Sequence, residues 1–144
     1  MTKDVMVTIT GLHTMDEDDD AIEVVHIGEH YERNGAHYIL FEERMEGMSA
    51  PVKNRIKIKD RCMEVQKKGA VNAAMIFEEA KSQSCTYAIP YGSFLLETYT
   101  TSVTVIEEEE RLEATAVYEL RVNGIHCAKS AIRVIIQPKE FFRL

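Results

Sequence analysis

Three histidines, on two neighbouring strand patterns, are the side chains of this sequence whose spacing is best suited to metal chemistry. Residues 21–33 and 36–46 alternate as strands and flank an Asn-Gly pair, which is typical of a two-residue hairpin turn. In that hairpin His26, His30 and His37 share one face, with His30 and His37 on a cross-strand diagonal. Two imidazoles in this arrangement could hold a metal ion. The pattern supplies no carboxylate or cysteine that completes a ligand set, so we predict neither a metal nor another cofactor.

Groups that could act as general acid and base are also present. Glu42 and Glu43 lie in the second of these strand patterns, and Lys67 lies on a later one. Together with the histidines they could exchange protons with a substrate. The sequence contains no nucleophile elbow, phosphate-binding loop, His-Glu-x-x-His motif or paired cysteines. It therefore indicates no catalytic residue and points away from an enzyme.

The elements that must position these residues are all predicted to be strands. Val5, Val7 and Ile9 alternate with Met6 and Thr8, the period of two that a half-buried strand requires. Comparable patterns predict strands over residues 4–14, 21–33, 36–46, 52–59, 61–67, 70–80, 85–104 and 111–122, and from 125 to Pro138. Both faces of the 21–46 hairpin are partly apolar, so the sequence leaves its inward side open.

Two of these strands are expected to bend. The stretch 85–104 breaks at Pro90-Tyr91-Gly92, and its apolar phase shifts near 100–102. We interpret it as one long strand with two corners, because a phase shift without a turn is typical of a β-bulge. The last strand follows a second Asn-Gly turn and shows a similar shift near 129–131, which predicts a second bulge.

Repeated hairpin patterns without helical periodicity or long crossovers indicate an all-β fold. An antiparallel meander of this length avoids unpaired edges by closing on itself. We therefore predict one domain over residues 1–144, an antiparallel up-and-down β-barrel of eight to ten strands, with a β-sandwich as the alternative.

A barrel of this size suggests a small-molecule or lipid-binding module that uses the barrel mouth or interior. Tyrosines, which combine an apolar body with a polar tip, are the candidates to line such a site; the same side chains could instead fill the core. The candidates are Tyr31, Tyr38, Tyr87, Tyr91 and Tyr118. The alternative function is protein interaction or self-association, for example as a homodimer, through an apolar outer patch that includes Leu95 and Tyr99.

The composition limits the class of partner and the compartment. A net charge of -7 argues against nucleic acid or a membrane surface, since both require clustered positive charge. No apolar run approaches the roughly 18 residues that cross a bilayer. Cys62, Cys85 and Cys127 are odd in number and lack paired spacing, which favours a reducing cytoplasm over a disulfide framework.

Four segments together resemble the uncharacterised bacterial family typified by YwiB, whose fold is a calycin-like β-barrel. They are G-E-H-Y-E-R-N-G-A-H-Y-I-L-F-E-E (28–43), V-Q-K-K-G-A-V (65–71), T-Y-A-I-P-Y-G-S-F-L-L-E-T (86–98) and Y-E-L-R-V-N-G (118–124). This chain departs from the family at Ile89, where threonine is usual, and at Lys67, where arginine is common. The resemblance implies a closed, lipocalin-like barrel in a bacterial cytosol. It implies no ligand, activity or site residue.

Overall fold

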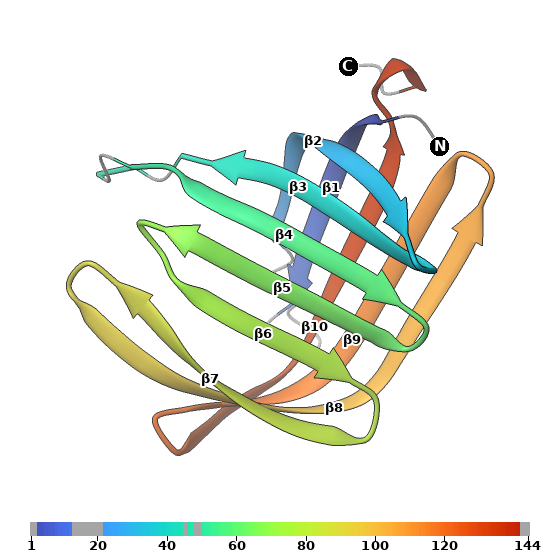
Figure 1. Ribbon diagram of the computed structural model, residues 1–144. Helices are drawn as coiled ribbons and strands as arrows, with labels where there is room; N and C mark the ends of the chain where they lie inside the picture. Colours follow the sequence, from blue (N-terminus) through green and yellow to red (C-terminus); the bar gives the residue numbers. More distant parts are fainter. Residues whose placement is uncertain (1–2, 13–21, 45, 48–49, 142–144) are drawn as a thin grey trace.

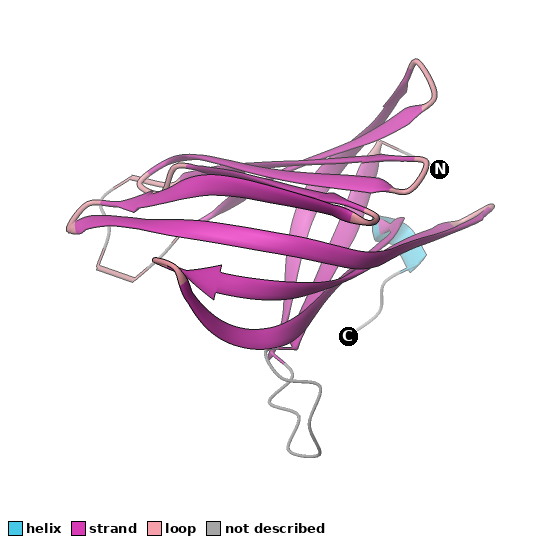
Figure 2. Ribbon diagram, turned by 90° about the horizontal axis from the view of Figure 1, so that it is seen from below, coloured by secondary structure: helices cyan, strands magenta, loops and turns pink. Residues whose placement is uncertain are grey.

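The computed structural model describes residues 3–12, 22–44, 46–47 and 50–141. Within them the chain forms ten strands and one short 3-10 helix (Figures 1 and 2). The elements are β1 Asp4–Leu12, β2 Ile22–Arg33, β3 Ala36–Glu43, β4 Val52–Lys59, β5 Cys62–Gly69, β6 Ala73–Glu78, β7 Lys81–Ile89, β8 Gly92–Glu108, β9 Arg111–Val122, β10 Ile125–Pro138 and η1 Lys139–Phe141. None of the helical residues described forms a segment long and apolar enough to cross a membrane.

The strands form one antiparallel sheet that curls into a nearly closed barrel. Their order is β6-β5-β4-β3-β2-β1-β10-β9-β8-β7, so the first and last strands of the chain pair with each other. The two ends of the sheet, β6 and β7, are consecutive in the chain, and an isolated bridge pairs Asn72, just before β6, with Ala88 on β7. The predicted up-and-down barrel is confirmed, and the sandwich alternative is not needed.

Both Asn-Gly pairs form the predicted hairpin turns. Asn34 and Gly35 have φ angles of 53° and 78°, and Asn123 and Gly124 have 50° and 83°. Positive φ at both central residues is the geometry of a type I′ turn. The flanking residues pair as expected, Arg33 with Ala36 and Val122 with Ile125.

The expectation of one long strand over 85–104 is wrong. Ile89 pairs with Gly92, so the chain reverses at Pro90-Tyr91 and forms the β7–β8 hairpin. Proline at the second position of a turn and glycine at the fourth are typical of a type I turn, which accounts for the reversal.

Both predicted bulges exist, and one lies elsewhere than expected. The β8–β9 register shifts between Thr100 and Ser102, as predicted. The β9–β10 register shifts between His126 and Ala128, two residues before the predicted 129–131. The earlier shift pairs Ser130 with Tyr118, and Ser130 is fully buried.

The barrel interior is packed solid over the half that contains the β2–β3, β4–β5 and β8–β9 turns. Its largest fully buried side chains include Ile39, Ile56, Ile58, Met63, Phe77, Leu112 and Ile136. Because Ile39 is buried whereas Leu40 is 37% exposed, the histidine-bearing face of the β2–β3 hairpin is the inward one. This settles the side of the hairpin that the sequence left open.

Candidate functional site

A hydrogen-bonded polar cluster, which we call the interior network, lies inside the other half of the barrel. It consists of Glu43 on β3, Asn54 on β4 and Lys67 on β5. Lys67 Nζ lies 2.7 Å from Glu43 Oε1 and 2.8 Å from Asn54 Oδ1, and Asn54 Nδ2 donates to Glu43 Oε1 at 2.8 Å. Each member therefore bonds to both of the others.

Strand register brings these three side chains together. Asn54 is paired with Phe41 on one side and with Lys67 on the other, and Glu43 lies two residues beyond Phe41. Since every second residue of a strand shares a face, all three point inward with the buried Val52 and Val65. Asn54 is only 3% exposed, and the side chains of Lys67 and Glu43 are 18% and 23% exposed.

The network keeps its carboxylate charged. Burial acts to raise the pKa of Glu43, but hydrogen bonds from Lys67 and Asn54 outweigh it, so the pKa is lowered. Glu43 is thus ionised at neutral pH. Its second carboxylate oxygen has no hydrogen-bond partner among the described residues.

His26 lies beside the network. Its ring stacks on Phe41 with 4.6 Å between ring centroids. Burial lowers the pKa of His26, and Lys67 adds to this effect while Glu43 opposes it, so the imidazole is neutral at pH 7. Its Nε2 atom is buried without a partner in the described part of the chain. Buried polar atoms are seldom left unpaired, and each one costs free energy.

An apolar wall faces the network from β7, β8 and β9. Tyr87 pairs with Phe94, and Leu96 pairs with Val122, on the same face as the buried Thr98 and Thr100. Burial raises the pKa of Tyr87, and the charge of Glu43 raises it further, which places this phenol within electrostatic reach of the network. The wall ends in exposed apolar side chains, with Phe94 41% exposed.

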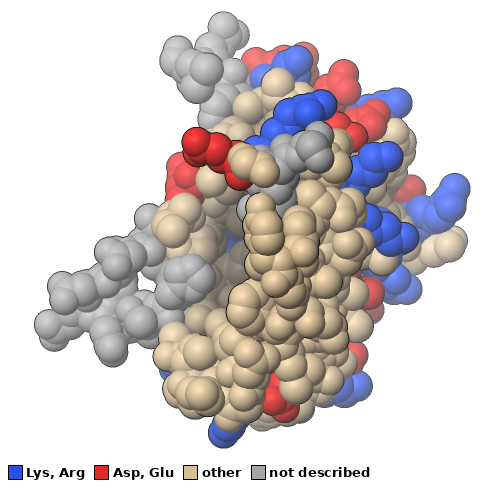
Figure 3. Space-filling model, turned by 90° about the vertical axis from the view of Figure 1, so that its left-hand side faces the viewer, with Lys and Arg blue, Asp and Glu red and all other residues tan. Residues whose placement is uncertain are grey.

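The inward side chains at this end of the barrel are partly exposed to solvent. Side chains on the inward face here, among them Leu96 and Val122, are half-buried, in contrast to the sealed core of the other half. Figure 3 looks onto this end: uncharged side chains cover the middle of the view, and charged ones gather along its right-hand side. The interior is thus a packed core at one end and a solvent-accessible, partly polar site at the other.

A groove of about 750 Å³ on the outer face is a weaker candidate. It extends across β2 to β5 and is lined by cations, including Lys53 and Arg55, as well as by anions, including Glu29 and Glu42. Because these opposite charges offset one another at the surface, the groove does not select a ligand by charge.

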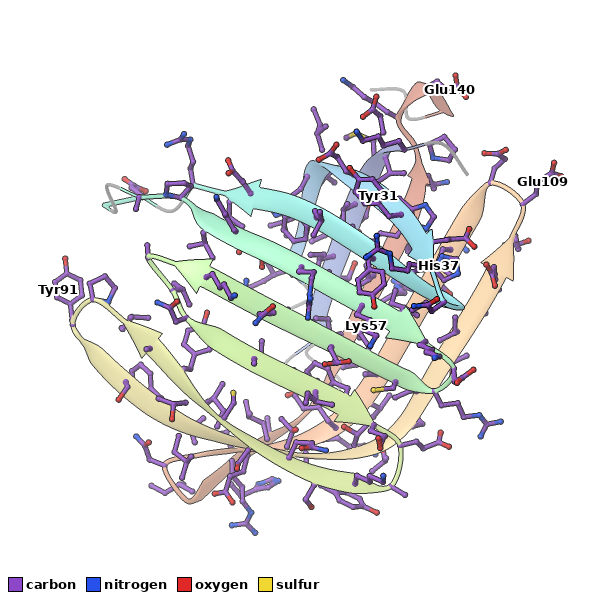
Figure 4. All side chains as sticks on the ribbon, in the orientation of Figure 1. Tyr31, His37, Lys57, Tyr91, Glu109 and Glu140 are labelled. Carbon is purple, nitrogen blue, oxygen red and sulfur yellow. The ribbon has the colours of Figure 1, made fainter. Side chains whose placement is uncertain are left out.

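The structure brings one of the five predicted tyrosines, Tyr87, to the site. Tyr118 points inward but packs against Phe77, with 4.8 Å between ring centroids, and so belongs to the core. Tyr31 and Tyr38 pair with each other on the outer face of the hairpin. The prediction that these two tyrosines line the interior is therefore wrong. Tyr91 is 88% exposed at the tip of the β7–β8 turn, away from the interior (Figure 4). On the outer face, the charged groups of Arg55 and Lys57 both lie within 6 Å of the centre of the Tyr38 ring, which is the range of a cation–π interaction.

The three histidines that the sequence places on one face do not lie together. His30 and His37 meet at 2.9 Å, whereas His26 lies about 13 Å along β2 from His30 at the usual rise per residue. Of the acid–base candidates, Glu43 and Lys67 form an ion pair, and Glu42 points to the outer face.

Asn54 is the network residue that sequence reasoning missed. It occupies the apolar phase of its strand, in line with Val52, Ile56 and Ile58. A polar residue in the inward phase of a strand could have identified it.

A model of the family described as "Domain of unknown function (DUF1934)" matches residues 7–134. The fold is similar to the crystal structure of ywiB protein from Bacillus subtilis, with a TM-score of 0.81 and 20% sequence identity over 94% of this chain and 92% of that one. No curated protein gives a significant match.

Proposed function

The chain belongs to the DUF1934 family, a domain of unknown function, and from its interior we propose that it is a non-catalytic barrel that binds a small amphipathic molecule. The observation that carries the proposal is the buried Nε2 of His26, which has no hydrogen-bond partner among the described residues, beside the network of Glu43, Asn54 and Lys67. A bound polar group would supply the partner that this nitrogen lacks.

The network offers both kinds of hydrogen bond to such a group. Lys67 has three ammonium hydrogens, of which Glu43 and Asn54 take two. Glu43 presents its second oxygen as an acceptor. Because Lys67 and Glu43 carry opposite charges, the site favours a neutral or zwitterionic head group over a strongly charged one.

The apolar wall would hold the remainder of the ligand. Phe94 and Leu96 lie on the inward face of β8 and form part of this wall. A ligand with a polar head and an apolar body fits this division, which is the usual character of small-molecule sites. In this use the protein would resemble lipocalin-type barrels.

We also propose that the ligand is bound in a bacterial cytoplasm. All three cysteines are free thiols, which fits a reducing compartment. The similar solved structure comes from a bacterium.

Fluorescence of 8-anilinonaphthalene-1-sulfonate, an amphipathic probe, tests the interior site on the full chain. We expect saturable binding of one probe per chain. Phe94→Ser should weaken it about tenfold, because burial of an aromatic side chain against a ligand contributes roughly 1–2 kcal/mol.

Tyr99→Ser is the matched control. Tyr99 lies on the same strand with 44% exposure, against 41% for Phe94, but on the outer face. Its replacement should leave probe binding unchanged. Equal effects of the two substitutions, or no saturable binding by wild type, would contradict an interior site.

A further inference from the structure

Two buried histidines face each other at the end of the barrel opposite the interior network. His30 on β2 and His37 on β3 are 5% and 8% exposed. Their rings stack at 5.1 Å between centroids, with His30 Nε2 2.9 Å from His37 Nδ1. The type I′ turn at Asn34-Gly35 fixes this approach, since it sets the register in which His37 pairs with Glu32, two residues from His30.

The partners of these rings assign their protons. Nε2 of His37 lies 2.8 Å from Glu107 Oε1 on β8, so this nitrogen carries the hydrogen and the carboxylate accepts it. Nδ1 of His37 then holds a lone pair, and His30 Nε2 donates to it. A metal ion bound by both nitrogens would take the place of that one shared proton.

A carboxylate stands beside the pair. Glu32 Oε1 lies 3.9 Å from His37 Nδ1, and ligand atoms of His30, Glu32 and His37 all lie within 4.8 Å of one another. In a tetrahedral zinc site with metal–ligand bonds of 2.0–2.1 Å, ligand atoms are about 3.3 Å apart. The observed separations lie on either side of this value, and Glu32, whose side chain is 61% exposed, is free to adjust.

Glu107 supplies the support that metal-binding histidines usually have. A ligating imidazole generally donates its other N–H to a carboxylate or carbonyl, which fixes its tautomer and orientation. His37 already has this bond to Glu107.

We propose that His30, His37 and Glu32 form a site for one divalent transition-metal ion, with zinc as the ion that two imidazoles and a carboxylate fit best. A water molecule completes four-coordination, and Glu107 is a positioning residue. The site is independent of the proposed interior ligand, which would bind at the other end of the barrel.

Calorimetric titration of zinc chloride into the metal-free full chain tests the proposal. We expect one zinc ion per chain with micromolar or tighter affinity. Cobalt substituted for zinc should show the intense visible absorption of a tetrahedral site. His30→Gln and His37→Gln should abolish stoichiometric binding, and Glu107→Gln should weaken it by about 10- to 100-fold.

His126→Gln is the matched control, because His126 also contacts a glutamate, Glu119, at 2.8 Å but on the exposed outer face. It should bind zinc like wild type. Glu32→Gln provides a test that does not disturb the buried pair, and should weaken binding about tenfold or more. Absence of stoichiometric zinc uptake by wild type, or an unchanged affinity in Glu32→Gln, would overturn the site.

Discussion

At the scale of residues, the Lys67–Glu43 pair is not explained by stability alone. Taking two charges out of water is costly, and an apolar pair of similar volume often stabilises a protein as well or better. Inside the barrel, Asn54 forms hydrogen bonds with both members of the pair. Beside the pair, Nε2 of His26 has no partner among the described residues. This combination is better suited to receive a polar group than to fill a core.

We expect the charge of Glu43 to stabilise the fold. Glu43→Gln leaves a mostly buried Lys67 without its counter-charge, so at pH 7 it should lower the free energy of unfolding by about 1–2 kcal/mol. Glu64→Gln, which breaks the more exposed Lys57–Glu64 pair, should change it by less than about 0.5 kcal/mol. Urea denaturation measures both.

The effect of Glu43 should depend on pH. Because its pKa is lower in the folded protein than the ordinary value of 4.5, the unfolded chain binds more protons at acid pH. The difference between wild type and Glu43→Gln should therefore be complete above about pH 4.5 and decline as the pH falls through the folded-state pKa. A difference that grows on acidification would contradict the assigned ion pair.

At the scale of elements, the sequence was most informative about turns and phase shifts. Asn34-Gly35 and Asn123-Gly124 determine their hairpins because few other residue pairs adopt positive φ at both positions. A phase shift, in contrast, indicates that a bulge exists but not where. Near Cys127 and Ala128 the side chains are small or weakly apolar, so several positions satisfy the same pattern, and pairing of Ser130 with Tyr118 decides among them.

Which face of the β2–β3 hairpin points inward depends on how β2 packs against both β1 and β3. The alternation within one strand does not reveal this. Gly28 lets β2 pack closely against β1 and β3: an added Cβ would lie 2.8 Å from the carbonyl oxygen of Leu40 and 3.0 Å from a methyl of Val7. Such close backbone approach is one reason for glycine in a strand. It follows from tertiary packing and cannot be read from alternation.

Gly28→Ala should lower the free energy of unfolding by roughly 1–3 kcal/mol, because the carbonyl of Leu40 belongs to the backbone and cannot move aside easily. Gly11→Ala is the control, since a Cβ there meets nothing within 4 Å. Thermal or urea denaturation compares them, and an equal loss in both variants would show that the close approach at Gly28 is unimportant.

At the scale of the whole molecule, one barrel combines a half whose inward side chains are fully buried with a half whose inward side chains are partly exposed. The meander and its closure were predictable, because alternating strands joined by short turns must bury their edges. The division of the interior was not, since it depends on which inward positions carry Glu43, Asn54 and Lys67 and on how far each strand extends. Apolar side chains also remain on the outer face, with Leu95 45% and Tyr99 44% exposed.

These outer residues support the alternative function, self-association, as a further proposal. Leu95 and Tyr99 lie on the same face of β8, two positions either side of Glu97, and exposed apolar groups of this kind often mark contacts between proteins. Light scattering coupled to size-exclusion chromatography should then give a mass that rises above 16.4 kDa with concentration.

Leu95→Lys should keep the protein at the monomer mass, because a charge in the contact would have to be desolvated. Ile106→Lys, with the same 45% exposure near the other end of β8, should behave like wild type. A wild-type chain that remains a monomer at every concentration would exclude self-association and leave ligand binding as the proposed function.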